Sequence, residues 1–208
     1  MNNARKLFLT VAAMLAAGCV DNVVAPRALS VVDSTIPGGG ATAALTQTDT
    51  LRFSFFIDPK KSSTYDLGEG NTITFPVGAV CELTTSSYGI GEWDKPCAIS
   101  KGSVTINTKA WLDANGYPRV DFDKHVRFVP SKDPKHWVML TLSDYGAGTF
   151  PWSKINYCPS SDAADCVDES VMDSTLVTTT DPITGKLSRR VKHFSGYSLT
   201  SGRSTDEL

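Results

Sequence analysis

The sequence KHFSGY, residues Lys192–Tyr197, lies close to the C-terminus of a chain of 208 residues. It places a histidine, an aromatic residue and a hydroxyl side chain in a row, within a segment, 187–199, that we expect to form one β-strand. The whole chain contains 16 glycines and 11 prolines, which separate short apolar runs. Because glycine and proline interrupt regular structure, this spacing predicts short strands that bring the last strand into a β-sandwich.

The clearest of the earlier strands is residues 51–57, LRFSFFI, where every second side chain is apolar. A period of two is typical of a strand with one face in a core. Together with 187–199, similar runs at 72–75, 103–108, 120–129, 136–142, 155–157 and 174–179 give about eight strands. No window carries an apolar stripe of helical period with caps, and 110–114 is expected to form at most one helical turn. We therefore predict an all-β fold, an antiparallel β-sandwich.

The N-terminus has the pattern of an export signal. Arg5 and Lys6 precede a short apolar run, 7–17, which ends in small residues. The sequence LAAGC at 15–19 resembles the bacterial lipobox, which implies that Cys19 is lipidated and becomes the first mature residue. That resemblance implies an envelope protein anchored by lipid, and the absence of aspartate after Cys19 favours the outer membrane where the cell has one. A plain secretory signal is the alternative, and the apolar run is shorter than the ~20 residues of a membrane-spanning helix.

Four segments follow from these patterns. Residues 1–18 are the expected lipoprotein signal peptide, and 19–49, rich in small and polar residues, form a flexible tether. Residues 50–202 form the sandwich, and 203–208 form a solvated tail. The net charge of −2 provides no basic field for nucleic acid.

The remaining cysteines are even in number once Cys19 is set aside: Cys81, Cys97, Cys158 and Cys166. In an exported chain this predicts two disulfides, and the simplest of three connectivities pairs neighbours, 81 with 97 and 158 with 166. Closing these loops would stabilise the fold by about 3 and about 2.5 kcal/mol. Zinc is the alternative, but no Cys-x-x-Cys occurs.

Three stretches resemble the ZU-five domain. These are residues 70–80 (GNTITFPVGAV), residues 127–130 followed by the apolar run 138–142, and residues 192–197. The resemblance implies a β-sandwich that acts mostly as an interaction module, as in ankyrins, netrin receptors and adhesion proteins. This chain differs from the family in its cysteine pairs and in the insertion 86–101.

In some relatives the protein cuts its own chain between the phenylalanine and serine of His-Phe-Ser. Carried onto this sequence, the Ser195 hydroxyl would attack the Phe194 carbonyl with His193 as general base, and a regular strand would place His193 and Ser195 on one face. The alternative is structural: His193 and Ser195 make hydrogen bonds, and Phe194 fills the core.

Two further groups could bind ligands. Trp93 and Trp152 lie in loops rich in glycine and proline and are the candidates for a glycan or peptide platform. The alternative is that they cover an end of the core. Five acidic residues surround Cys166 and could offer oxygens to calcium, although the EF-hand spacing is absent and a solvated loop is the alternative: Asp162, Asp165, Asp168, Glu169 and Asp173.

The expected function is a non-enzymatic interaction or structural module of the bacterial envelope. We expect a monomer without metal or cofactor, attached to the membrane by lipid, with a protein or glycan partner. The alternatives are an autoprocessing domain that cleaves Phe194–Ser195, and a glycan- or peptide-binding sandwich.

Overall fold

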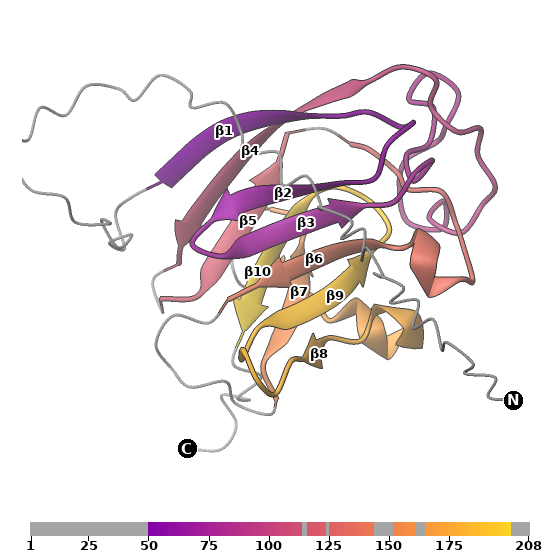
Figure 1. The fold of residues 1–208 in the computed structure, drawn as a ribbon. Coiled ribbons are helices and arrows are strands. Elements are labelled where there is room, and N and C mark those ends of the chain that lie inside the picture. Colours follow the sequence, from indigo (N-terminus) through magenta and orange to yellow (C-terminus); the bar gives the residue numbers. More distant parts are fainter. Residues whose placement is uncertain (1–49, 114–115, 124, 144–151, 161–164, 201–208) are drawn as a thin grey trace, which may run out of the picture.

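The fold is a sandwich of two antiparallel five-stranded sheets in a computed structural model, which describes residues 50–113, 116–123, 125–143, 152–160 and 165–200 (Figure 1). The first sheet, called sheet A here, has the order β1 (Thr50–Ile57), β4 (Val104–Leu112), β5 (Pro118–Phe122), β10 (Gly196–Thr200) and β7 (Lys154–Cys158). Sheet B has the order β2 (Ser63–Gly68), β3 (Asn71–Phe75), β6 (Val138–Leu142), β9 (Leu187–Val191) and β8 (Thr179–Thr180). The predicted all-β sandwich is therefore confirmed.

In the part of the chain that the structure describes, three short 3₁₀ turns accompany the strands: Pro134–His136, Glu169–Val171 and Ser174–Leu176. Each follows an aspartate whose carboxylate accepts a hydrogen bond from a backbone N–H of the turn. Among the described residues, no helix has the length and apolar character needed to cross a membrane.

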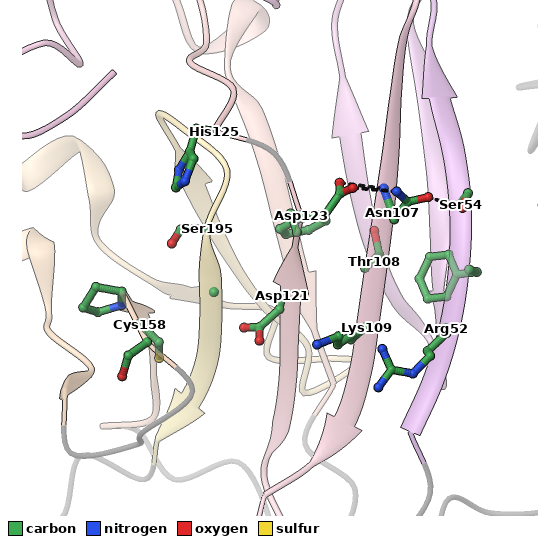
Figure 2. A pocket seen from close by; sticks show the side chains of 15 residues that line it. Arg52, Ser54, Asn107, Thr108, Lys109, Asp121, Asp123, His125, Cys158 and Ser195 are labelled. Atoms are coloured by element: carbon green, nitrogen blue, oxygen red, sulfur yellow. Dashed lines mark hydrogen bonds between the residues drawn. The ribbon is translucent and has the colours of Figure 1, made fainter. Parts of the chain in front are cut away.

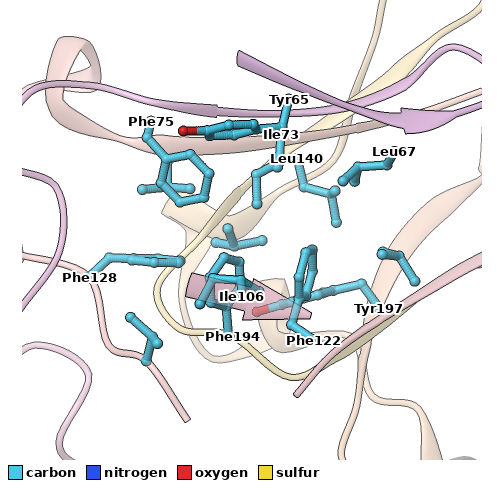
Figure 3. Packing of buried hydrophobic residues seen from close by; sticks show 14 of the residues in the cluster. Tyr65, Leu67, Ile73, Phe75, Ile106, Phe122, Phe128, Leu140, Phe194 and Tyr197 are labelled. Atoms are coloured by element: carbon cyan, nitrogen blue, oxygen red, sulfur yellow. The ribbon is translucent and has the colours of Figure 1, made fainter. Parts of the chain in front are cut away.

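The core lies between the sheets and is rich in aromatic side chains (Figure 3). Tyr65 and Phe75 enter it from sheet B and face Phe122 and Tyr197 from sheet A. Phe194 lies at its centre, fully buried, and its ring stacks on that of Phe122 with centroids 4.2 Å apart. The structural alternative for Phe194, a side chain that fills the core, is therefore what the structure contains.

The prediction of one strand over 187–199 is wrong. Val191 ends β9 in sheet B and Gly196 begins β10 in sheet A, so 192–195 crosses from one sheet to the other. The predicted strand 120–129 is shortened for the same reason, because β5 ends at Phe122 and the chain then runs alongside the crossing segment. The two segments pair at the bridge between Arg127 and His193, and Phe194 N–H donates to Val126 at 2.7 Å. Lys192, His193 and Phe194 are buried at this corner, so burial continues beyond the end of β9.

Three smaller expectations are corrected. Ten strands are described rather than about eight, since β2 was not predicted and the predicted strand 187–199 is the two strands β9 and β10. Residues 110–112 belong to β4 and are not helical, because their backbone pairs with both β1 and β5. The predicted strand 174–179 is mainly a 3₁₀ turn, capped by the Asp173 carboxylate.

Both predicted disulfides are present with the local connectivity, Cys81–Cys97 and Cys158–Cys166. The predicted lipidation site Cys19, the predicted signal peptide and tether, and the tail 203–208 lie outside the described residues.

Candidate functional site

The crossing segment 192–195 directs its side chains into different surroundings. His193 and Phe194 are fully buried, whereas Ser195 is partly exposed and lines a groove on the outer side of sheet A. The expectation that His193 and Ser195 share a strand face assumed a regular strand, and the chain bends here instead. Among the described residues, the hydrogen bonds of the His193 ring go to other partners.

A loop closed by the first disulfide covers this segment. We call residues 82–96, between Cys81 and Cys97, the cover loop. The Trp93 ring stacks on the His193 imidazole with centroids 3.9 Å apart. The Lys192 ammonium binds the Asp94 carboxylate at 2.5 Å, and this ion pair ties the cover loop to the crossing segment a second time. The cover loop, which overlaps the predicted insertion 86–101, thus packs on Lys192 and His193.

Tyr88 is the polar centre of the cover loop. Its hydroxyl donates a hydrogen bond to the Phe194 carbonyl oxygen and lies 3.3 Å from Nδ1 of His193. The Ser195 side chain acts on the same phenol, because it opposes the rise in the pKa of Tyr88. Burial raises the pKa of Tyr88 well above its usual value, so the phenol is neutral at ordinary pH. A neutral phenol can polarise the Phe194 carbonyl but is a poor base for Ser195.

The other side of His193 faces a buried ion pair. Its Nε2 lies 3.4 Å from Oε1 of Glu169, whose second oxygen accepts a hydrogen bond from the guanidinium of Arg189. Arg189 points from β9 into the sandwich, is fully buried, and donates to the Ile155 carbonyl at 2.6 Å on β7. Burial raises the pKa of Glu169, but the His193 hydrogen bond and the charge of Arg189 outweigh it, so the net pKa is lowered.

Three members of the acidic cluster bind three different cations rather than one shared centre. Asp168 binds Lys154 at 2.6 Å, Glu169 binds Arg189, and Asp173 binds Lys192. No group of three or more potential metal ligands occurs among the described residues. Asp165 hydrogen-bonds Ser160 at 2.5 Å, and Asp162 lies outside the described residues.

The two loop tryptophans have different surroundings. Trp93 is half-buried, with His193 against its ring, so part of its surface is already covered. Trp152 is 50% exposed, just before β7. Trp137, at the start of β6, is half-buried, and the Arg190 guanidinium lies 4.5 Å from its ring centroid.

A groove of about 610 Å³ runs over the outer face of sheet A and ends at Ser195 and His125 (Figure 2). Strand register explains its lining, because Arg52 of β1 pairs with Lys109 of β4, and Lys109 pairs with Asp121 of β5. Asp121 pairs in turn with Gly196 of β10. These four positions form one row across the sheet, two cations followed by a carboxylate and a residue without a side chain.

Gly196 deepens the groove. A Cβ atom at this position would lie 2.4 Å from Oδ1 of Asp121 and 2.7 Å from the Cys158 carbonyl oxygen. Any larger residue would therefore displace the Asp121 carboxylate or the backbone of β7. Burial raises the pKa of Asp121, against the opposing charges of Arg119 and Lys109.

Several of these residues carried no signal in the sequence. Tyr88 and Arg189 lie far from the residues that they contact, and the groove cations come from different strands. Glu169 was predicted only as part of an acidic loop. Comparisons of the chain with protein-family models, curated proteins and solved structures gave no match.

Proposed function

We propose that this protein is an exported, lipid-anchored binding module of the bacterial envelope and that its ligand occupies the groove over sheet A. The observation that carries this proposal is the row of charged and polar side chains on the outer sheet face, beside the glycine that deepens the groove. Ligand sites are concave and place a few polar groups so that they converge. The export signal and the resemblance to ZU-five interaction modules support display at a surface.

The binding role is tested by mapping where envelope oligosaccharides and peptides perturb the protein. In NMR titrations of the isotope-labelled full chain, we expect the backbone amides of Arg52, Asn107, Lys109 and Asp121 to shift, because these residues line the groove. The backbone amides of Thr180, in the edge strand β8 of sheet B, and of Gly185, between β8 and β9, serve as the internal control. Shifts confined to residues outside the groove would contradict the assignment of this surface.

Autoprocessing is the second candidate, and it is favoured by the contacts of Tyr88. Its hydroxyl binds the Phe194 carbonyl oxygen and contacts Ser195, so it would polarise the bond to be attacked. Ser195 Oγ would add to the Phe194 carbonyl carbon, the Phe194–Ser195 C–N bond would break, and the amine of Ser195 would take a proton. Water would then hydrolyse the ester to a C-terminal Phe194 carboxylate and the free Ser195 hydroxyl.

Intact mass after prolonged incubation tests this candidate. Cleavage predicts two chains that separate on denaturation, one of them beginning at Ser195, because neither disulfide joins the two sides of the bond. Ser195→Ala should abolish the second chain, and Tyr88→Phe, which retains the ring, should slow its formation. A single uncut species that includes Leu208 would exclude autoprocessing and leave the binding role as the proposal.

A further inference from the structure

The two cations of the groove, Arg52 and Lys109, differ from three other cations of this protein that bind carboxylates. Arg189 binds Glu169, Lys192 binds Asp94 and Asp173, and Lys154 binds Asp168. Arg52 and Lys109 take part in no such ion pair among the described residues, although the charge of Lys109 opposes the burial that raises the pKa of Asp121. Both are exposed on the same sheet face.

Their placement is unfavourable for the folded protein alone. Arg52 and Lys109 are directly opposite in the β1–β4 register, and Figure 2 shows the two side chains next to each other. Like charges at directly opposite positions destabilise an antiparallel pair. A local arrangement that works against stability is expected mainly at functional sites. A bound anion would turn this repulsion into attraction.

The neighbouring row of the groove is polar and ordered. The Ser54 hydroxyl donates to Asn107 Oδ1 at 2.6 Å, and Asn107 Nδ2 donates to Asp123 at 2.5 Å. These two linked hydrogen bonds fix the orientation of the Ser54 hydroxyl and of the Asn107 amide. The three side chains together offer both donors and acceptors at the sheet surface. Such a row suits the hydroxyl groups of a sugar.

The charges limit the kind of anion. Asp121 and Asp123 line the same groove as Arg52 and Lys109. A group with a single negative charge therefore fits better than a phosphate, whose second charge would be repelled by these carboxylates. The arginine guanidinium binds a carboxylate through two parallel hydrogen bonds.

We propose that the ligand is an acidic oligosaccharide, in which a sugar carboxylate binds Arg52 and Lys109 and adjacent hydroxyl groups bind Ser54, Asn107 and Asp123. This inference rests on the proposed function, since it names the ligand class of the same groove. It assigns the specificity to Arg52 and Lys109, and it gives the polar row the role of orienting the sugar.

The experiment compares two probes that differ only in charge, an oligogalacturonate and its methyl ester, by calorimetry and NMR with the full chain. The acid should bind about tenfold or more tightly than the ester, since a hydrogen bond to a charged group is stronger than one to a neutral group. Arg52→Gln and Lys109→Gln should each weaken binding of the acid by about tenfold. Lys60→Gln, an exposed cation in the turn after β1, is the matched control and should bind like the wild type.

A second readout separates this role from a structural one. Because Arg52 and Lys109 repel each other, Arg52→Gln should leave the unfolding midpoint unchanged or raise it while affinity falls. A variant that loses stability together with affinity would overturn the assignment of Arg52.

The remaining outcomes separate the inference from the proposed function. If acid and ester bind the groove equally, or inorganic phosphate displaces the acid, the ligand class is wrong while the groove remains the binding surface. If neither probe binds and the wider panel of envelope oligosaccharides and peptides also leaves the groove amides unchanged, both the ligand class and the proposed binding surface are wrong.

Discussion

Replacing Phe194 with alanine should lower the free energy of unfolding by about 3–5 kcal/mol, the range for a buried phenylalanine. Its side chain is fully buried, stacks on Phe122, and contacts the rings of Phe75 and Phe128 edge-on. Truncation would leave a cavity where the chain crosses between the sheets. The neighbouring rings would keep the two sheets apart, so the cavity could not close. Urea unfolding followed by tryptophan fluorescence measures the change.

Phe56→Ala is the matched control for Phe194. Phe56 lies on β1 but is 62% exposed on the outer sheet face, so its removal should change the free energy of unfolding by at most about 0.5 kcal/mol. A loss below about 1 kcal/mol for Phe194→Ala would contradict the central position of this ring in the core.

Replacing Glu169 with alanine should also lower the free energy of unfolding by about 3–5 kcal/mol. The reason differs, because this change creates an uncompensated charge rather than a cavity. Arg189 is fully buried and its guanidinium binds the Glu169 carboxylate, so removing the carboxylate leaves the cation inside the sandwich without its partner. His193 loses its contact to the same carboxylate.

The control is an exposed ion pair of the same protein. Asp58→Ala removes the partner of Lys61, whose side chain is 78% exposed, and should cost less than about 1 kcal/mol. The double variant Glu169→Leu with Arg189→Met should recover much of the loss, because an apolar pair of similar size leaves no buried charge. Equal losses for Glu169→Ala and Asp58→Ala would mean that the Arg189 charge is not isolated from water.

Glu169 also predicts a dependence on pH. Its pKa in the folded protein is lowered from 4.5, since the His193 hydrogen bond and Arg189 outweigh the opposing effect of burial. A lowered folded-state pKa contributes stability that is present above pH 4.5 and is lost as the pH falls through the folded-state value. The difference in unfolding free energy between wild type and Glu169→Gln should therefore shrink below pH 4.5. A difference that stays constant down to pH 2 would contradict this assignment.

The alternation at 51–57 and the even number of cysteines could be interpreted without a structure, because both depend on local rules. A strand with one face in a core must alternate, and β1 does. An even number of cysteines in an exported chain predicts two disulfides, and the structure shows which of the three connectivities forms. The all-β class follows from the same local patterns.

The corner at 192–195 could not be predicted in this way. Lys192, His193 and Phe194 are buried like most side chains of the strands on either side, since the corner is covered by the sandwich on one side and by the cover loop on the other. Only the pairing of Gly196 with Asp121 and of Val191 with Val138 shows that the two halves belong to different sheets.

The local chemistry of this protein is therefore determined by its sequence: alternating strands, two disulfides closed over short loops, and a hydroxyl beside Phe194. The tertiary structure decided which side chains contact one another. It placed Tyr88 on the Phe194 carbonyl, Glu169 between Arg189 and His193, and Arg52 opposite Lys109. Each of these contacts joins residues that lie far apart in the chain, and their distances depend on strand register and on how the sheets pack, which no local pattern encodes.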